Sequence, residues 1–226
     1  MRDARTKSLG TLIRRDKVRS ISAGGTYDWS DDSGALNLVQ AQVSKGIPIL
    51  GNSENNDVLL SRANGRTDFS KATAYISRTQ SLDDDFSLFL ASEGQWAFTQ
   101  MLALEEFSYG GAQFGRGYDG GEISGDHGVS GLIELRRSLS EIAFPPFVTS
   151  AQIFSSYDFG ATWRIDVDNR QRQLTGASVA AGLRFKIWDT ANLELQLAAP
   201  LTRGINAVSQ EDSKDWRGFL SFNIPW

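Results

Sequence analysis

The sequence predicts an all-β protein, an antiparallel transmembrane β-barrel of which about nine strands are present, and three observations support this prediction. Apolar and polar residues alternate over long stretches: in 191–201 the leucines share one side, and Asn192, Glu194 and Gln196 share the other. Such stretches exceed the roughly 5 to 6 residues that are usual in globular proteins. Their connections are short and long in turn, as in bacterial outer-membrane barrels.

Composition narrows the class of protein further. The chain has no cysteine, which excludes a disulfide scaffold and a thiolate metal site. The net charge is −4 and the basic residues are dispersed, so the sequence has no basic cluster of the kind that binds nucleic acid. Because the single histidine, His127, has no cysteine or second histidine near it, we expect no metal site. No apolar run reaches the roughly 20 residues of a spanning helix, whereas a spanning strand needs only about 9 to 11.

Nine strands are expected, in the order 17–29, 35–46, 66–79, 86–100, 128–138, 147–163, 173–188, 191–201 and 216–226. The second and third alternate poorly, so their faces are not assigned. In 173–188 the apolar face begins at Ala177, and Arg184 and Lys186 lie on the opposite face. Long strands with one apolar and one charged face describe a barrel with a polar lumen.

The connections orient these strands. Short ones hold turn residues, such as 31–34, the acidic run within 81–85 and 189–190, and are expected in the periplasm. The first strand then begins outside the cell and the last ends in the periplasm. Since single-chain barrels close with an even number of strands, residues 1–226 are expected to be one C-terminal part of a barrel. The start of the chain shows no signal peptide, which agrees with a missing beginning.

The longest connection, 101–127, is rich in glycine and centred on Arg116. Its residues 115–120 match the dinucleotide fingerprint G-x-G-x-x-G, but that fingerprint needs a helix to follow it. Glycine recurs in 121–128 without an apolar helical period, so no helix is expected there. Nucleotide binding is therefore rejected.

The same loop carries a family resemblance. It reads Phe107-Ser-Tyr-Gly-Gly, then Gly115-Arg116-Gly117-Tyr118-Asp119, then a G-D-x-G segment that leads into an E-L-R strand. This order resembles the sixth extracellular loop of two-partner secretion transporters of the hemolysin-activator type, although Gly115 stands where that family usually has valine. The resemblance implies a sixteen-strand barrel, with strands eight to sixteen present here and with the POTRA domains, the plug helix and the early strands absent.

The resemblance also implies a function. It predicts a non-enzymatic protein of the Gram-negative outer membrane that exports a large partner polypeptide of the hemolysin or adhesin type, without ATP or another cofactor. The expected partners are that secreted protein, the barrel-assembly machinery and outer-membrane lipids, and the loop is expected to fold into the lumen.

Individual residues follow from the family motif. In the family the loop arginine pairs with an aspartate on the second strand after the loop, which matches Asp158 in Tyr157-Asp158-Phe159-Gly160. Alternation independently puts Asp158 on the lumen side. The expected lumen lock therefore consists of Arg116, Gly117, Tyr118, Asp119, Asp158 and Gly160. Glu134 and Arg136 are expected to face the lumen beside it.

The last strand resembles the C-terminal signal that the assembly machinery recognises. Its apolar face comprises Leu220, Phe222, Ile224 and the terminal Trp226. Tyr27, Trp29 and Trp188 lie near expected periplasmic strand ends, where an aromatic girdle would form.

Two alternatives remain open. The chain could belong to the insertase branch of the same superfamily, although the G-D-x-G segment and the E-L-R strand favour export. An outer-membrane enzyme, such as a barrel lipase, would need a Ser/His pair at the membrane edge, whereas the only histidine lies in the loop.

Overall fold

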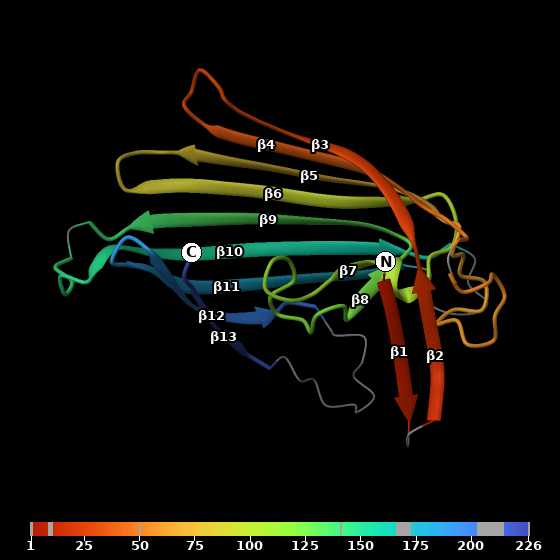
Figure 1. Cartoon of the computed structure of the whole chain (residues 1–226). Helices are drawn as coiled ribbons and strands as arrows, with labels where there is room; N and C mark the ends of the chain where they lie inside the picture. The colour runs from red at the N-terminus through yellow and green to blue at the C-terminus, as the bar shows by residue number, and fades with distance from the viewer. Residues whose placement is uncertain are drawn as a thin grey trace.

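The computed structural model describes residues 2–8, 11–49, 51–140, 142–165, 173–202 and 215–225. Nine strands form one antiparallel sheet in the order β13-β12-β11-β10-β9-β6-β5-β4-β3. Their bounds are β3 Ser20–Ser30, β4 Leu36–Gly46, β5 Ser70–Ser81, β6 Phe86–Ala97, β9 His127–Ser138, β10 Val148–Trp163, β11 Gln173–Ile187, β12 Ala191–Pro200 and β13 Arg217–Asn223. The result is a curved, unclosed, barrel-like sheet (Figure 1).

All nine expected strands are present, and the all-β, antiparallel prediction is confirmed. Within the described residues, no helix is long and apolar enough to cross a membrane. The first expected strand, 17–29, differs at its start because Val18 ends another strand and is buried. That strand, β2 Thr11–Val18, pairs with β1 Arg2–Ser8 in a hairpin that stands away from the sheet (Figure 1). The hairpin was not predicted, since its polar sequence shows no period-2 pattern.

The sheet has two chemically different faces. On the outer face large apolar side chains are exposed, among them Ile76, Ile133, Ile153, Phe159, Leu195 and Leu197. On the inner face polar side chains are buried, among them Glu134, Ser156, Asp158 and Ser178. Register agrees with this division, since Asp158 lies opposite Ser178 and Tyr157 opposite Val179. The predicted faces of 173–188 and 191–201 are therefore confirmed.

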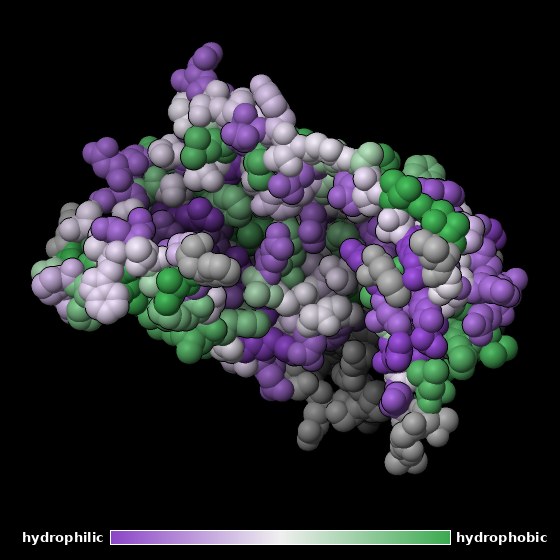
Figure 2. Space-filling view, viewed as in Figure 1, coloured by the Kyte–Doolittle hydropathy of each residue, from purple (hydrophilic) through white to green (hydrophobic). Residues whose placement is uncertain are grey.

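Two apolar clusters hold the remaining chain against the sheet. One lies on the inner face and joins Ala91 and Leu132 of the strands to Phe107, Tyr109, Phe114, Tyr118 and Ile123 of the long loop. The other lies at the end of the sheet that carries the long connections and comprises Val18, Leu60, Phe69, Ala97, Met101 and Leu102. The sheet's own inner face thus becomes a core only because the loop covers it. Figure 2 shows this hollowed face, with polar residues deep in the hollow.

Candidate functional site

The loop between β6 and β9 is an ordered element that folds back onto the inner face. It contains a single 3-10 turn, η1 Ala103–Glu105, and a short hairpin of β7 Phe107–Tyr109 and β8 Ile123–Gly125 (Figure 1). Gly110, directly after β7, has φ 125°, and a Cβ there would lie 2.1 Å from the carbonyl oxygen of Asp119. Only glycine fits that position, which explains part of the glycine content of the loop.

Glycines on the strands form the seat for this hairpin. A Cβ at Gly160 would lie 2.3 Å from the Tyr109 ring, and one at Gly128 would lie 2.0 Å from the Phe107 ring. At Gly176 the nearest atom would be Ile123 Cδ1 at 2.6 Å. Any side chain at these three positions would hold the hairpin off the sheet. Gly160 was expected at the site from the motif, and the structure shows a steric reason for glycine there.

Arg116 is buried at the centre of an ionic cluster on the inner face. Its Nη1 donates to Glu134 Oε2 at 3.1 Å and to Ser156 Oγ at 2.6 Å, and its Nε donates to the carbonyl of Ala112 at 3.2 Å. Glu134 also accepts from Arg136 Nε at 2.7 Å and from Arg184 Nη1 at 2.7 Å. A fully buried carboxylate therefore accepts hydrogen bonds from arginines of the loop and of two strands, and Arg184 has a second acidic partner in Glu194.

The expected pairing of Arg116 with Asp158 is wrong in this structure, because Arg116 pairs with Glu134 instead. Asp158 Oδ1 accepts from the Tyr109 hydroxyl at 2.9 Å, the Gly115 amide at 2.7 Å and the Ser178 hydroxyl at 2.5 Å. This oxygen is already occupied by three neutral donors. Glu134 lies directly opposite Ser156 in the register, where the Arg116 guanidinium sits. Both carboxylates hold the loop tip, but only Glu134 does so through the arginine.

The other predicted lock residues lie around this centre. A Cβ at Gly117 would lie 2.6 Å from the Pro200 amide nitrogen, so the loop backbone presses against β12. Tyr118 is buried, and its hydroxyl lies 3.0 Å from the Ala177 carbonyl oxygen. Gly117 and Tyr118 therefore fix the loop to β11 and β12.

Asp119 and Arg136 complete the predicted set. Asp119 is exposed and lies apart from the Arg116 cluster, where it pairs with Arg217 of β13. That hydrogen bond lowers the pKa of the Asp119 carboxyl from its ordinary value. Arg136 lies on the inner face as predicted, and its guanidinium stacks 4.3 Å from the Phe89 ring centroid.

A second ionic cluster at the base of the loop was missed by the sequence analysis. Arg62, in the connection between β4 and β5, contacts Glu106 Oε1 at 2.7 Å and Asp126 Oδ1 at 2.6 Å. Close by, Lys71 Nζ lies 2.9 Å from Glu105 Oε2. Glu105, Glu106 and Asp126 flank the apolar part of the loop in the sequence. Because buried carboxylates need cationic partners, these three residues could have indicated the cluster.

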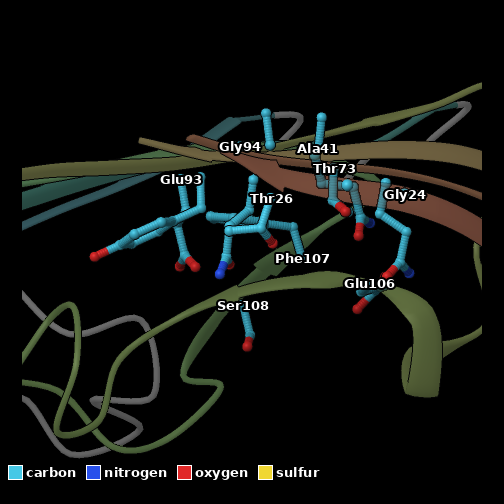
Figure 3. Close-up of a pocket in the computed structure, with 15 residues that line it drawn as sticks. Gly24, Thr26, Ala41, Thr73, Glu93, Gly94, Glu106, Phe107 and Ser108 are labelled. Carbon is cyan, nitrogen blue, oxygen red and sulfur yellow. The ribbon is translucent and has the colours of Figure 1, made fainter. Parts of the chain in front are cut away.

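Beside the hairpin the inner face remains hollow, with a cavity of about 560 Å³. Figure 3 shows Glu106, Phe107 and Ser108 of the loop on one side, and Thr26, Thr73 and Glu93 of the strands on the other. Gln40, Gln42 and Gln95 add amide groups to its wall. The free space beside the loop is therefore lined mainly by hydrogen-bonding side chains.

The remaining predicted residues lie at the margins of the sheet. Leu220, Phe222 and Ile224 are exposed, and Trp226 lies outside the described residues. Tyr27 and Trp29 stack at 5.3 Å near the turn after β3, and Trp188 is exposed at the turn before β12. His127 Nδ1 accepts the Ala97 amide at 3.2 Å. Within the described ranges no three His, Cys, Asp or Glu side chains converge on a metal position.

An unclosed antiparallel barrel sheet with an apolar outer face, a polar inner face and a loop folded onto that inner face defines the outer-membrane β-barrel class. The chain belongs to the haemolysin secretion/activation protein family ShlB/FhaC/HecB, whose sequence profile matches residues 12–185. Its fold is similar to CdiB from Escherichia coli, with a TM-score of 0.72 at 19% identity. That match covers 94% of this chain and 37% of CdiB, so the chain spans little more than a third of that structure's length. No curated protein matches the chain.

Proposed function

We propose that this chain forms part of a two-partner secretion transporter that carries an extended partner polypeptide through its lumen, while the loop 101–127 holds the lumen in a defined conformation. The observation that supports this most strongly is the docking of the loop through buried Arg116 and Glu134. A loop of this length is not needed to join two adjacent strands. Burying a charged side chain of the loop costs free energy unless that charge is paired, and Glu134 provides the pair for Arg116 in the docked position.

The hollow beside the hairpin supports a polypeptide as the cargo. An extended chain in transit exposes amide groups, and these need hydrogen-bonding partners where water is excluded. The cavity wall provides such partners through Gln40, Gln42, Thr26 and Thr73. A passage of this kind needs no chemical step and no cofactor.

The two faces and two ends of the sheet support an outer-membrane position. Exposed apolar side chains on the outer face suit contact with lipid, and the short turns would face the periplasm. The exposed face of the last strand, with Leu220, Phe222 and Ile224, would then be available to the barrel-assembly machinery before it meets lipid. The hemolysin or adhesin type of partner remains part of this proposal.

Secretion of the partner protein tests the proposal, measured in cells that produce the full-length gene product and normalised to its abundance in the outer membrane. Arg116→Ala should reduce secretion strongly while the barrel still inserts. Gln113→Ala is the matched control, because Gln113 lies in the same loop but is exposed. Unchanged secretion by Arg116→Ala would contradict the proposal. Normal secretion together with poor assembly of other barrels would instead indicate the insertase branch.

A further inference from the structure

The base of the loop is where its two legs leave and rejoin the sheet. Gln95 of β6 joins the legs through the carbonyls of Glu105 and Asp126, and a charged side chain from a different connection, Arg62, joins them as well. Arg62 lies in residues 47–69, the connection between β4 and β5. Its Nη1 donates to the Met101 carbonyl at 2.9 Å and to Glu106 at 2.7 Å, both on the outgoing leg. The same guanidinium binds Asp126 on the returning leg through Nη1 at 2.6 Å and Nη2 at 3.2 Å.

We propose that Arg62 is a second positioning residue of the transporter, which clamps the two legs of the loop and couples them to the 47–69 connection. This inference rests on the proposed function of the loop. It adds a contact that acts at the opposite end of the loop from Arg116 and comes from a different connection.

Burial makes this contact energetically significant. The side chains of Asp126 and Glu106 are 0% and 6% exposed, and that of Arg62 is 16% exposed. Asp126 also accepts the amides of Met101 at 2.6 Å and Ile165 at 2.7 Å, so its carboxylate is held in one position. Removing the arginine would leave two buried carboxylates close together without their shared cation.

The connection that carries Arg62 is itself held firmly. Leu60 and Phe69 are buried in the same apolar cluster as Met101 and Leu102. The Arg15 amide of β2 donates to the Leu59 carbonyl at 2.6 Å. A Cβ at Gly65 would lie 2.6 Å from Leu102, which shows how closely the connection meets the loop. A clamp attached to such a support can transmit a displacement of the connection to the loop.

The two anchoring points have distinct partners. The Arg116 cluster uses β9, β10 and β11, whereas Arg62 contacts the legs of the loop and no strand of that cluster. Loss of Arg62 should therefore loosen the base and the adjoining hairpin residue Phe107 while the contacts of Arg116 can still form. The hairpin would spend more time away from Ala91, which it covers on β6.

Thiol labelling measures this uncovering directly. Residues 1–226 contain no cysteine, so Ala91→Cys is a single reporter beneath the loop, 8% exposed, once any cysteine elsewhere in the full-length gene product has been replaced by serine. In isolated outer membranes, a membrane-impermeant maleimide should modify this thiol slowly. Adding Arg62→Met should raise the rate about tenfold or more, which corresponds to about 1.4 kcal/mol in the opening equilibrium.

Arg66→Met is the matched control, since Arg66 lies in the same connection but pairs only with Asp68 among the ion pairs of the described residues. It should leave the labelling rate unchanged. Arg62→Lys, which retains the charge without the two-pronged geometry, should give an intermediate rate and covers the case in which Arg62→Met reduces barrel abundance.

An unchanged rate in both Arg62 variants would overturn the inference, as would an equal increase in Arg66→Met. Because labelling requires no partner polypeptide, such a result would leave the secretion test of Arg116→Ala unaffected. The converse also holds. Faster labelling in Arg62→Met together with normal secretion by Arg116→Ala would support the clamp and reject the proposed function of the loop.

Discussion

Substitution of Arg116 and Glu134 together should show that these two residues act as a unit. Glu134 is fully buried and accepts hydrogen bonds from Arg116, Arg136 and Arg184, all within 3.1 Å. Removing one partner of a buried ion pair costs about 3 to 5 kcal/mol. Arg116→Met leaves Glu134 with two other arginines, so its cost should lie at the lower end of that range. Glu134→Gln removes the carboxylate that three guanidinium groups share, and Arg184 alone of the three keeps an acidic partner, Glu194, among the ion pairs of the described residues, so its cost should be higher.

These costs convert into rates of thiol labelling at Ala91→Cys, because the loop must open before the thiol reacts. A cost of about 3 kcal/mol corresponds to roughly a hundredfold faster labelling. The free-energy cost in the double variant should be smaller than the sum of the two single costs by about 1 to 3 kcal/mol, which is the coupling energy expected for residues in contact. The labelling rates of the Ala91→Cys protein, the two single variants and the double variant are measured in isolated outer membranes and normalised to barrel abundance.

The comparison with Asp158 decides whether this assignment is right. Asp158 shares no hydrogen bond with Arg116 in the described structure, although it binds the neighbouring Gly115 amide. Coupling between Arg116→Met and Asp158→Asn should therefore be weaker than coupling with Glu134→Gln. Stronger coupling to Asp158, or fully additive effects with Glu134, would refute the reasoning.

Three further predictions concern the surroundings of the loop. Gly160→Val places a side chain into the Tyr109 ring, so it should cost about 1 to 3 kcal/mol and speed labelling at Ala91→Cys, whereas Gly25→Val, which meets no atom within 4 Å, should not. Asp119→Ala should leave labelling within about twofold, because exposed ion pairs contribute little; a larger change would show that the Arg217 contact holds the loop. Hydrogen bonds from Arg66 and Asn55 lower the pKa of the Asp68 carboxyl to about 2. Its contribution to stability should therefore be complete above its ordinary pKa of 3.8 and be lost as the pH falls toward 2. The melting temperature of the wild type should then fall with acid more steeply than that of Asp68→Asn, and parallel curves would contradict this prediction.

The strands could be predicted from the sequence because a sheet with two different faces imposes a strict period of two. That rule gave the faces of 173–188 and 191–201, and it placed Asp158 on the inner side. It could not give the β1–β2 hairpin, whose exposed polar residues carry no face preference. Nor could it show the β7–β8 hairpin, because each strand has only three residues.

The partners within the site could not be predicted for a different reason. Alternation fixes which way Glu134 and Asp158 point, but not which of them an arginine from a folded loop will reach. That choice depends on the position of the loop backbone, which the seat of Gly128, Gly160 and Gly176 determines through packing. The contact of Arg62 with Asp126 spans 64 positions in the chain and likewise depends on tertiary structure alone.

Disulfide formation between the loop and the strand beneath it tests the central claim, that the loop is docked on the lumenal face in the membrane. In Gly160→Cys the new Cβ would lie 2.4 Å from Cγ of Tyr109, within reach of a Tyr109→Cys partner, because Cβ atoms in disulfides lie about 3.8 Å apart. Residues 1–226 have no other cysteine, and once any cysteine elsewhere in the full-length gene product has been replaced by serine, the double variant should form this bond in outer membranes almost completely. The pair Tyr109→Cys and Gly25→Cys should not form one. A membrane-inserted double variant that keeps both thiols free under oxidation would contradict the account.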